Sequence, residues 1–175
     1  MQHGELELEL TFLAKYLPKE IDGIEPTMLK DIYVPESAPH PNLRIRQNGN
    51  SFEITRKQPV SEGDASAQTE QTITLDKAEF DDLSKSSNKS VAKKRYQVKI
   101  DGRPAEVDVF QEKLTGLVLI DFEFGSAAEK TAFEAPDCCL ADVTQEEFIA
   151  GGILSGKSYS DIKDELLRFN YKPLQ

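Results

Sequence analysis

Acidic residues recur at alternate positions in three segments of the chain, a spacing that suits metal chemistry. The pairs are Glu7 and Glu9, Glu106 and Asp108, and Asp121 and Glu123, each alternating with apolar residues. Side chains two residues apart on a β-strand point to the same face, about 7 Å from each other. Carboxylates at that spacing can share a hard divalent cation. One pair alone is more typical of a half-buried strand with a solvated acidic face, but the recurrence favours a common purpose.

Basic residues follow the same alternating pattern in three other segments. They are Arg44 and Arg46, Lys57 on the same face as Glu53 and Thr55, and Lys93 and Arg95. Like charges crowded together inside a protein repel one another strongly unless a ligand or counter-ion joins them. A polyanion together with a divalent metal would satisfy both signs at once.

The apolar residues of these segments determine how the strands must be arranged. They are Leu6, Leu8, Leu10, Ile45, Ile54, Tyr96, Val98, Val107, Val109, Ile120, Phe122 and Phe124. So many apolar side chains cannot face water together, so we expect them to pack against covering helices. The charged face then lines the inside of a curved sheet, which predicts a barrel with a charged tunnel. Asn48-Gly49 and Asp101-Gly102 are tight hairpin signals that join neighbouring strands.

Other signals place a further strand, the helices and the loops. Residues 70–75 read as a strand, 76–83 as a short capped helix, and 59–68 and 84–90 as loops. Thr144-Gln145-Glu146-Glu147 has the form of a capping box and predicts a helix that begins there. Residues 158–169 carry apolar side chains at helical spacing.

Composition limits the classes of function. The 175 residues are most simply a single domain, residues 1–175, with a sizeable core. The net charge of −10 argues against nucleic acid or an anionic membrane surface as a partner. Cys138 and Cys139 are adjacent, which gives no disulfide framework and favours packing roles in a reducing cytoplasm. Neither a signal peptide nor a membrane span is expected, and the isolated His3 and His40 are not expected to bind metal.

Taken in order, the charged motifs resemble the CYTH family, the triphosphate tunnel metalloenzymes. The matching pieces are Glu7-x-Glu9, Leu43-Arg44-Ile45-Arg46, Thr55-x-Lys57, Glu70, Lys93-x-Arg95-Tyr96, Val107-Asp108-Val109-Phe110 followed by Leu114-x-Gly116-Leu117, Asp121-x-Glu123-Phe124 and Asp142-Val143-Thr144. Each piece is weak alone, whereas their order and spacing together are specific. The resemblance implies an α+β fold, an eight-stranded closed antiparallel tunnel with helices packed outside, that binds a triphosphate and Mg²⁺ or Mn²⁺.

The resemblance also implies roles for individual residues. It assigns metal binding to Glu7, Glu9, Asp121 and Glu123, phosphate binding to Arg44, Arg46, Lys57, Lys93, Arg95 and Tyr33, and catalysis to Lys57 and Arg95. The implied activity is metal-dependent hydrolysis of the terminal phosphoanhydride of inorganic, nucleoside or thiamine triphosphate. Lys57 matches a family lysine near the attacking water, and a role as base would require a lowered pKa.

One departure from the family keeps other functions open. Aligned on Phe12, the chain has Thr11 where the family has a lysine. In the family this lysine pairs with a tyrosine, whose counterpart here is Tyr33. If the alignment on Phe12 is shifted, Glu5 and Glu7 would be the metal pair in place of Glu7 and Glu9. The alternatives are adenylate cyclisation of the class IV type and a non-catalytic module that binds polyphosphate or nucleotides, in a monomer or homodimer.

Because the carboxylates outnumber the bases, we expect metal to bind before phosphate.

Overall fold

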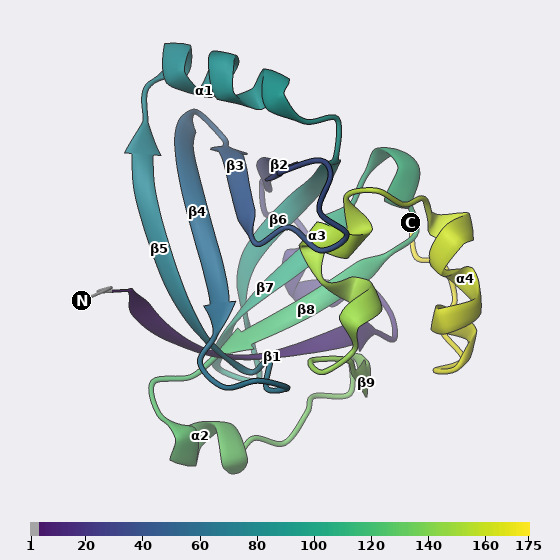
Figure 1. The fold of residues 1–175 in the computed structure, drawn as a ribbon. Helices are drawn as coiled ribbons and strands as arrows, with labels where there is room; N and C mark the ends of the chain where they lie inside the picture. Colours follow the sequence, from purple (N-terminus) through teal and green to yellow (C-terminus); the bar gives the residue numbers. More distant parts are fainter. Residues whose placement is uncertain (1–3) are drawn as a thin grey trace.

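The computed structural model describes residues 4–175, and its central feature is a closed antiparallel β-barrel (Figure 1). The strands are β1 (Glu5–Ala14), β2 (Thr27–Val34), β3 (Leu43–Asn48), β4 (Ser51–Pro59), β5 (Ala67–Leu75), β6 (Ser90–Ile100), β7 (Arg103–Phe110), β8 (Val118–Glu123) and β9 (Cys139–Asp142). Their order is β5-β4-β3-β2-β6-β7-β8-β1-β9, and pairing of β5 with β1 closes the first eight. The predicted class and the eight-stranded tunnel are confirmed. His3 lies outside the described residues.

Strand β1 closes the barrel by using both of its edges. Its first half pairs with β5, from Glu5 opposite Glu70 to Leu8 opposite Ala67. From Glu9 onward it pairs with β8. The short β9 pairs with residues 12–14, beyond the part of β1 that β5 covers. The strand that carries Glu7 and Glu9 is therefore the seam of the barrel.

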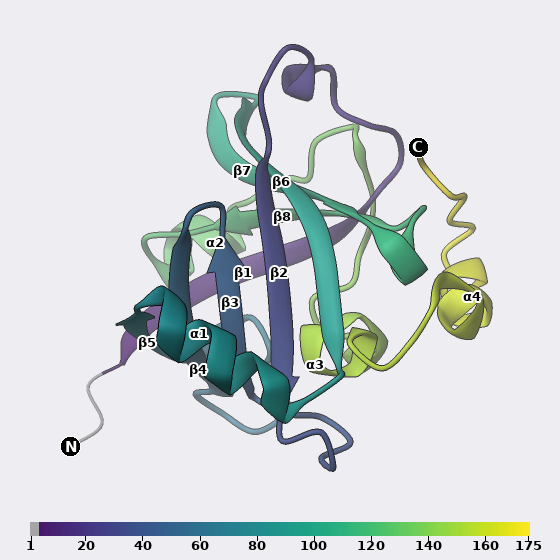
Figure 2. The ribbon, with the colours of Figure 1, turned by 90° about the horizontal axis from the view of Figure 1, so that it is seen from above.

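Apolar residues of the outer face pack under helices and loops, as the alternation predicts. Helix α1 (Lys77–Leu83) lies across the outside of β3 and β4 and places Phe80 against Ile32 and Ile45 (Figure 2). Asp76 and Glu79 cap this helix reciprocally, which confirms the predicted start. On the opposite side, Phe133 packs against Phe122 at 4.7 Å between ring centroids. Cys138 is buried in the same cluster, a packing role as predicted.

The predicted hairpins are present, and each uses a glycine in the left-handed region. Gly49 joins β3 to β4 with φ 58°, and Gly102 joins β6 to β7 with φ 79°. Side chains larger than hydrogen are strained at such angles, so glycine fits both turns. The remaining elements are α2 (Ala127–Thr131), α3 (Gly151–Leu154), α4 (Tyr159–Leu167) and the 3₁₀ turns Lys19–Ile21, Ser84–Ser86, Glu112–Leu114 and Glu147–Ile149. Within the described residues, no helix is long and apolar enough to cross a membrane.

The segment before α4 differs from the expectation that all helices lie outside. Ile149, Gly152 and Leu154 line the tunnel cavity, and α3 lies at one end of the barrel (Figure 1). Gly151 permits this approach, because a Cβ atom there would collide with the hydroxyl of Tyr33. Inward apolar residues of the strands, such as Phe110 and Leu119, complete the packing at this end.

The predicted capping box at Thr144 is wrong. The Thr144 hydroxyl lies 2.5 Å from Asp142 Oδ1 and accepts a hydrogen bond from the Thr11 amide at 3.0 Å. The 3₁₀ turn that follows, Glu147–Ile149, has no side-chain cap. Thr144 instead fastens the chain to β1, a tertiary contact that local pattern cannot show. The helix predicted at 158–169 is confirmed as α4, capped by Ser158 and Asp161.

Candidate active site

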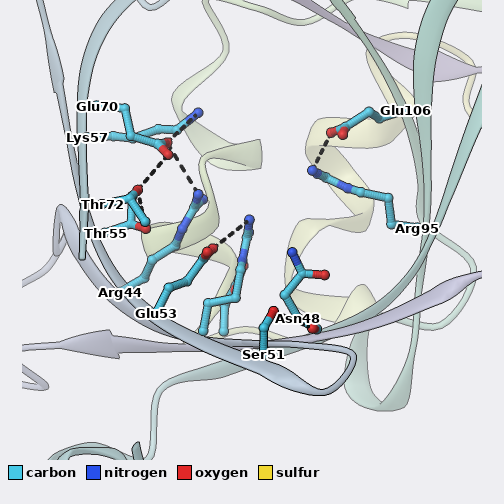
Figure 3. A network of polar contacts seen from close by, with 12 residues as sticks. Arg44, Asn48, Ser51, Glu53, Thr55, Lys57, Glu70, Thr72, Arg95 and Glu106 are labelled. Atoms are coloured by element: carbon cyan, nitrogen blue, oxygen red, sulfur yellow. Dashed lines mark hydrogen bonds and ion pairs between the residues drawn. The ribbon is translucent and has the colours of Figure 1, made fainter. Parts of the chain in front are cut away.

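All ten predicted site residues line one cavity of about 900 Å³ inside the barrel. They are Glu7, Glu9, Tyr33, Arg44, Arg46, Lys57, Lys93, Arg95, Asp121 and Glu123. Arg44, Lys57 and Glu70 project from one side of this space, and Arg95 with Glu106 projects from the other (Figure 3). The alternation of the strands therefore gathers residues more than a hundred positions apart.

The cations form a basic wall, defined here as Arg44, Arg46, Lys57, Lys93 and Arg95 on strands β3, β4 and β6. Lys57 forms ion pairs with Glu7 and with Glu70, the latter at 3.2 Å. Burial lowers the pKa of Lys57, but the neighbouring Glu9 and Glu7 outweigh it and the pKa is raised above the ordinary lysine value. Lys57 is thus an ammonium that donates hydrogen bonds, which counts against a base role while the acids are free.

Arg46 makes a buried two-point ion pair that the sequence did not indicate. Its Nε donates to Asp31 Oδ1 at 2.6 Å and its Nη2 to Asp31 Oδ2 at 2.7 Å. The exposed fractions are 6% for Arg46 and 2% for Asp31. Burial alone would raise the pKa of Asp31, but the guanidinium holds it well below its usual range.

Arg95 and Lys93 converge on Asp108 in the same way. Arg95 donates through Nε and Nη2 to the two oxygens of Asp108, each at 2.7 Å, and its Nη1 pairs with Glu106. Lys93 also bonds to Asp108. Against the effect of burial, the two cations lower the pKa of Asp108 to about 2. Burial lowers the pKa of Lys93, an effect that Asp108 offsets only in part.

The acidic wall, defined as Glu7, Glu9, Asp121 and Glu123 on β1 and β8, is much less neutralised. Glu9 lies directly opposite Glu123, and Thr11 opposite Asp121, in the pairing of the two strands. Burial and the nearby charges of Glu9 and Asp108 raise the pKa of Asp121 to about 8. The pKa of Glu123 is also raised, by burial and then by repulsion from Glu106 and Glu9. These carboxylates are short of positive charge.

The donor set of the acidic wall fits a hard divalent cation. Asp121 Oδ1 is buried without a hydrogen-bond partner, an unmet need that a cation would satisfy. Among the residues that the structure describes, no three acids or imidazoles already converge as a ready cage. The oxygen donors and the unpartnered atom therefore fit a divalent cation at this wall.

The register on Phe12 is favoured by the placement of the N-terminal acids. Glu7 and Glu9 line the cavity, whereas Glu5 is exposed and lies outside its lining. Thr11 also lines the cavity, and its hydroxyl approaches Glu9 Oε1 at 3.5 Å. The position of the family lysine thus faces the tunnel and carries no charge here.

Sequence reasoning assigned Asp31 no role and treated Asp108 only as one of the tunnel charges. Residues 27–34 form β2, in which Asp31 and Tyr33 alternate with apolar Ile32. The same alternation of polar and apolar residues would have identified Asp31 as a tunnel residue. With these residues, the strands contribute eight carboxylates and five cations to the lining. The empty tunnel is more acidic than the sequence motifs alone suggested, which strengthens the expectation that metal binds first.

A closed barrel with a two-signed charged interior defines a class of proteins that bind a polyanion together with metal. The chain is 33% identical over 144 residues to the inorganic triphosphatase of Nitrosomonas europaea, covering 81% of this chain and 91% of the relative. The crystal structure of the inorganic triphosphatase NE1496 superposes with a TM-score of 0.62 at 28% identity, covering 88% of this chain and 97% of that one.

More distant structures share the fold. A putative adenylate cyclase from Bacillus halodurans matches with a TM-score of 0.53 at 17% identity, over 99% of this chain and 95% of the other. No family model matches the sequence. The similarity to the Nitrosomonas europaea triphosphatase, together with the barrel, shows that the chain belongs to the CYTH family of triphosphate tunnel metalloenzymes, as the motifs predicted.

Proposed function

We propose that this protein is a metal-dependent triphosphatase that hydrolyses the terminal phosphoanhydride of a triphosphate. The observation that carries the proposal is one cavity in which a basic wall faces an acidic wall that is only partly neutralised. Its similarity to the inorganic triphosphatase of Nitrosomonas europaea supports the same activity.

In this proposal Glu7, Glu9, Asp121 and Glu123 hold Mg²⁺ or Mn²⁺. When bound, the metal neutralises charge on the phosphate oxygens and lowers the pKa of bound water. With Glu7 engaged as a metal ligand, its ion pair with Lys57 would be weakened. The ammonium then becomes available to donate to the transferred phosphoryl group or to orient the attacking water.

Arg95 and Lys93 supply fixed positive charge where charge develops on the transferred phosphoryl group. Their partner Asp108 is buried, with 1% of its side chain exposed, so it holds them in place without swinging into the cavity. Preorganised charge of this kind is usually the largest contribution in phosphoryl transfer. Arg95 and Lys57 are accordingly the proposed catalytic residues.

The lining favours an inorganic substrate over a nucleotide. Among the described residues that line the cavity, the aromatic rings are those of Tyr33, His40 and Phe110. Tyr33 and Phe110 are 7% and 3% exposed, packed against the C-terminal segment. Neither of these two rings offers a free face on which an adenine could stack, and the partly exposed His40 is the one remaining aromatic ring among the described lining residues. This scarcity of free rings also disfavours the cyclase alternative.

A phosphate-release screen tests the proposal. Tripolyphosphate, diphosphate, ATP and thiamine triphosphate are each incubated with Mg²⁺ or Mn²⁺. We expect release from tripolyphosphate and not from diphosphate. Formation of cyclic AMP from ATP would support the cyclase instead, and tight binding without turnover would support the non-catalytic module.

We also propose that residues 1–175 act as a single domain in the cytoplasm, as a monomer or homodimer that binds neither nucleic acid nor membrane. Two unpaired cysteines, Cys138 and Cys139, support a reducing compartment. Size-exclusion chromatography with light scattering measures the oligomeric state.

A further inference from the structure

We infer that the two arginines of β3 have different tasks: Arg44 binds phosphate through its two-donor edge, whereas Asp31 holds Arg46 as a fixed charge removed from such binding. The inference rests on the proposed function for the identity of the anion. It assigns Asp31 as a positioning residue, and it predicts unequal responses from two arginines that the sequence presents as equivalent.

Arg46 and Asp31 are matched by the sheet itself. They lie opposite each other in the pairing of β2 with β3, with both side chains directed to the tunnel side. The edge of Arg46 formed by Nε and Nη2 is fully used, because each nitrogen donates to a different oxygen of Asp31. What remains toward the cavity is Nη1, which lies 4.0 Å from Glu53 Oε1.

Displacing Asp31 from Arg46 would be costly. The carboxylate is 2% exposed, so a phosphate that took the edge of Arg46 would leave a buried charge without a partner. Breaking one side of such a pair is strongly unfavourable. A phosphate can therefore feel the charge of Arg46 and contact Nη1, but it cannot take the edge that Asp31 occupies.

Arg44 lies two residues from Arg46 on the same face, but no buried acid occupies its donors. Its Nε is buried and has no hydrogen-bond partner. Its Nη2 reaches Glu70 Oε2 only at 3.5 Å, the outer limit of a hydrogen bond, while Glu70 also pairs with Lys57. The two-donor edge of Arg44 is thus not matched by a protein acceptor, and a phosphate with two oxygens would supply the missing partners.

The test is a pair of charge-preserving substitutions. Arg44→Lys and Arg46→Lys each keep the positive charge and remove the planar edge. Binding of the bis-methylene analogue of tripolyphosphate, which cannot be hydrolysed, is measured by calorimetry with Mg²⁺ present. We expect Arg44→Lys to weaken binding about tenfold or more, as loss of a charge-assisted hydrogen bond implies. Arg46→Lys should weaken it about twofold while lowering the melting temperature, because Asp31 loses its matched partner.

Arg56→Lys is the matched control. Arg56 lies on β4 with its side chain exposed outside the barrel, and it should change neither binding nor melting temperature. Equal loss of binding in Arg44→Lys and Arg46→Lys would overturn the inference, as would a larger loss in Arg46→Lys.

Asp31→Asn provides the second, independent measurement. The amide keeps the size of the side chain but removes its charge, which releases the edge of Arg46 and makes the tunnel less acidic. We expect the analogue to bind several-fold more tightly, about the effect of one added charged hydrogen bond. Unchanged or weaker binding in folded Asp31→Asn protein would contradict a positioning role. The lysine pair decides the matter if Asp31→Asn does not fold.

These measurements are separable from the proposed activity. Wild-type release of phosphate from tripolyphosphate tests hydrolysis, whereas the variants are compared by equilibrium binding alone. Tight analogue binding with the predicted order of variants, but without turnover, would uphold the inference and reject the triphosphatase.

Discussion

The two walls of the tunnel carry opposite charges and also differ in how completely those charges are matched. On the basic wall, Arg46 and Arg95 each have a buried aspartate as partner, Asp31 and Asp108. On the acidic wall, Asp121 has a buried oxygen without a partner and a pKa raised to about 8. The basic wall is therefore preorganised by the protein itself, whereas the acidic wall is finished only when a cation arrives.

The fold therefore supplies the ordered cations of the basic wall, whereas the metal of the acidic wall must come from solution. Buried acids fix the positions of Arg46 and Arg95 before any ligand binds. They also add negative charge, so the tunnel repels a polyanion until metal is present. Substitutions on the two walls should consequently fail in different ways.

The largest expected effect comes from removing the metal. In excess chelator, turnover of tripolyphosphate should fall to background and affinity for the bis-methylene analogue should fall with it, because the lining carries more acids than cations. Glu9→Gln or Glu123→Gln should reproduce the loss of turnover. Glu5→Gln, on the same strand face but outside the cavity, is the control, and unchanged affinity in chelator would refute the metal-first order.

Loss of a preorganised cation should come next. Arg95→Ala should lower kcat about a hundredfold or more, because a fixed positive charge near the transferred phosphoryl group is lost. Turnover is measured per folded molecule, with Lys99→Ala on the exposed part of β6 as control. If Arg95→Ala protein keeps full activity and only melts earlier, Arg95 is a structural partner of Asp108.

The stability of the metal-free protein should depend on pH with opposite sign on the two walls. Asp121 has a folded pKa of about 8 against an ordinary value of 3.8, so between these values the folded protein holds a proton that the unfolded chain has lost, and stability falls as pH rises from 3.8 to about 8. Asp31 and Asp108 have lowered pKa values, so their contribution is present above 3.8 and is lost as pH falls toward the folded values. Melting temperatures in chelator should show both limbs.

Asp121→Asn identifies the alkaline limb. The substitution should abolish the loss of stability that accompanies a rise in pH from about 4 to about 8, and it should leave the acid limb unchanged. An alkaline limb that persists in Asp121→Asn would assign it to a different group.

The smallest effect is expected at Thr11. Thr11→Lys places a positive charge opposite Asp121 and two residues from Glu9, where it should weaken metal affinity several-fold by repulsion. At saturating metal it should raise turnover, provided that the missing cation limits phosphate positioning. Metal titrations of activity measure both, and the neutral Thr11→Val serves as control. No change in either quantity would mean that the cation at this position has no function here.

The alternation of charged and apolar residues was enough to predict the barrel and most of the charged strand residues that line it, although not Asp31. This worked because a strand has a period of two, so the side on which Glu7, Arg44 or Lys93 points follows directly from its neighbours. The turns at Gly49 and Gly102 were equally local, since each depends on left-handed residues within the turn itself, Gly49 in one and Asp101 with Gly102 in the other.

What the sequence could not give was partner choice across strands. Asp31 meets Arg46 because β2 pairs with β3 in one particular register, which no local pattern specifies. Thr144 looked like a helix cap because its neighbours match that motif, yet its hydroxyl bonds to β1. The sequence likewise presents Arg44 and Arg46 alike, although in the structure Nε of Arg44 has no hydrogen-bond partner and Nε of Arg46 donates to Asp31.

The position of β1 at the seam has a consequence for folding. Its residues pair with β5 partners about sixty positions away and with β8 partners more than a hundred positions away, contacts that a folding chain forms late. Two of the proposed metal ligands sit on this strand, so a cation that binds them holds the barrel shut and disfavours its opening. Amide hydrogens of β1 should therefore exchange faster than those of the β3–β4 hairpin in chelator, and metal should slow the first set far more than the second.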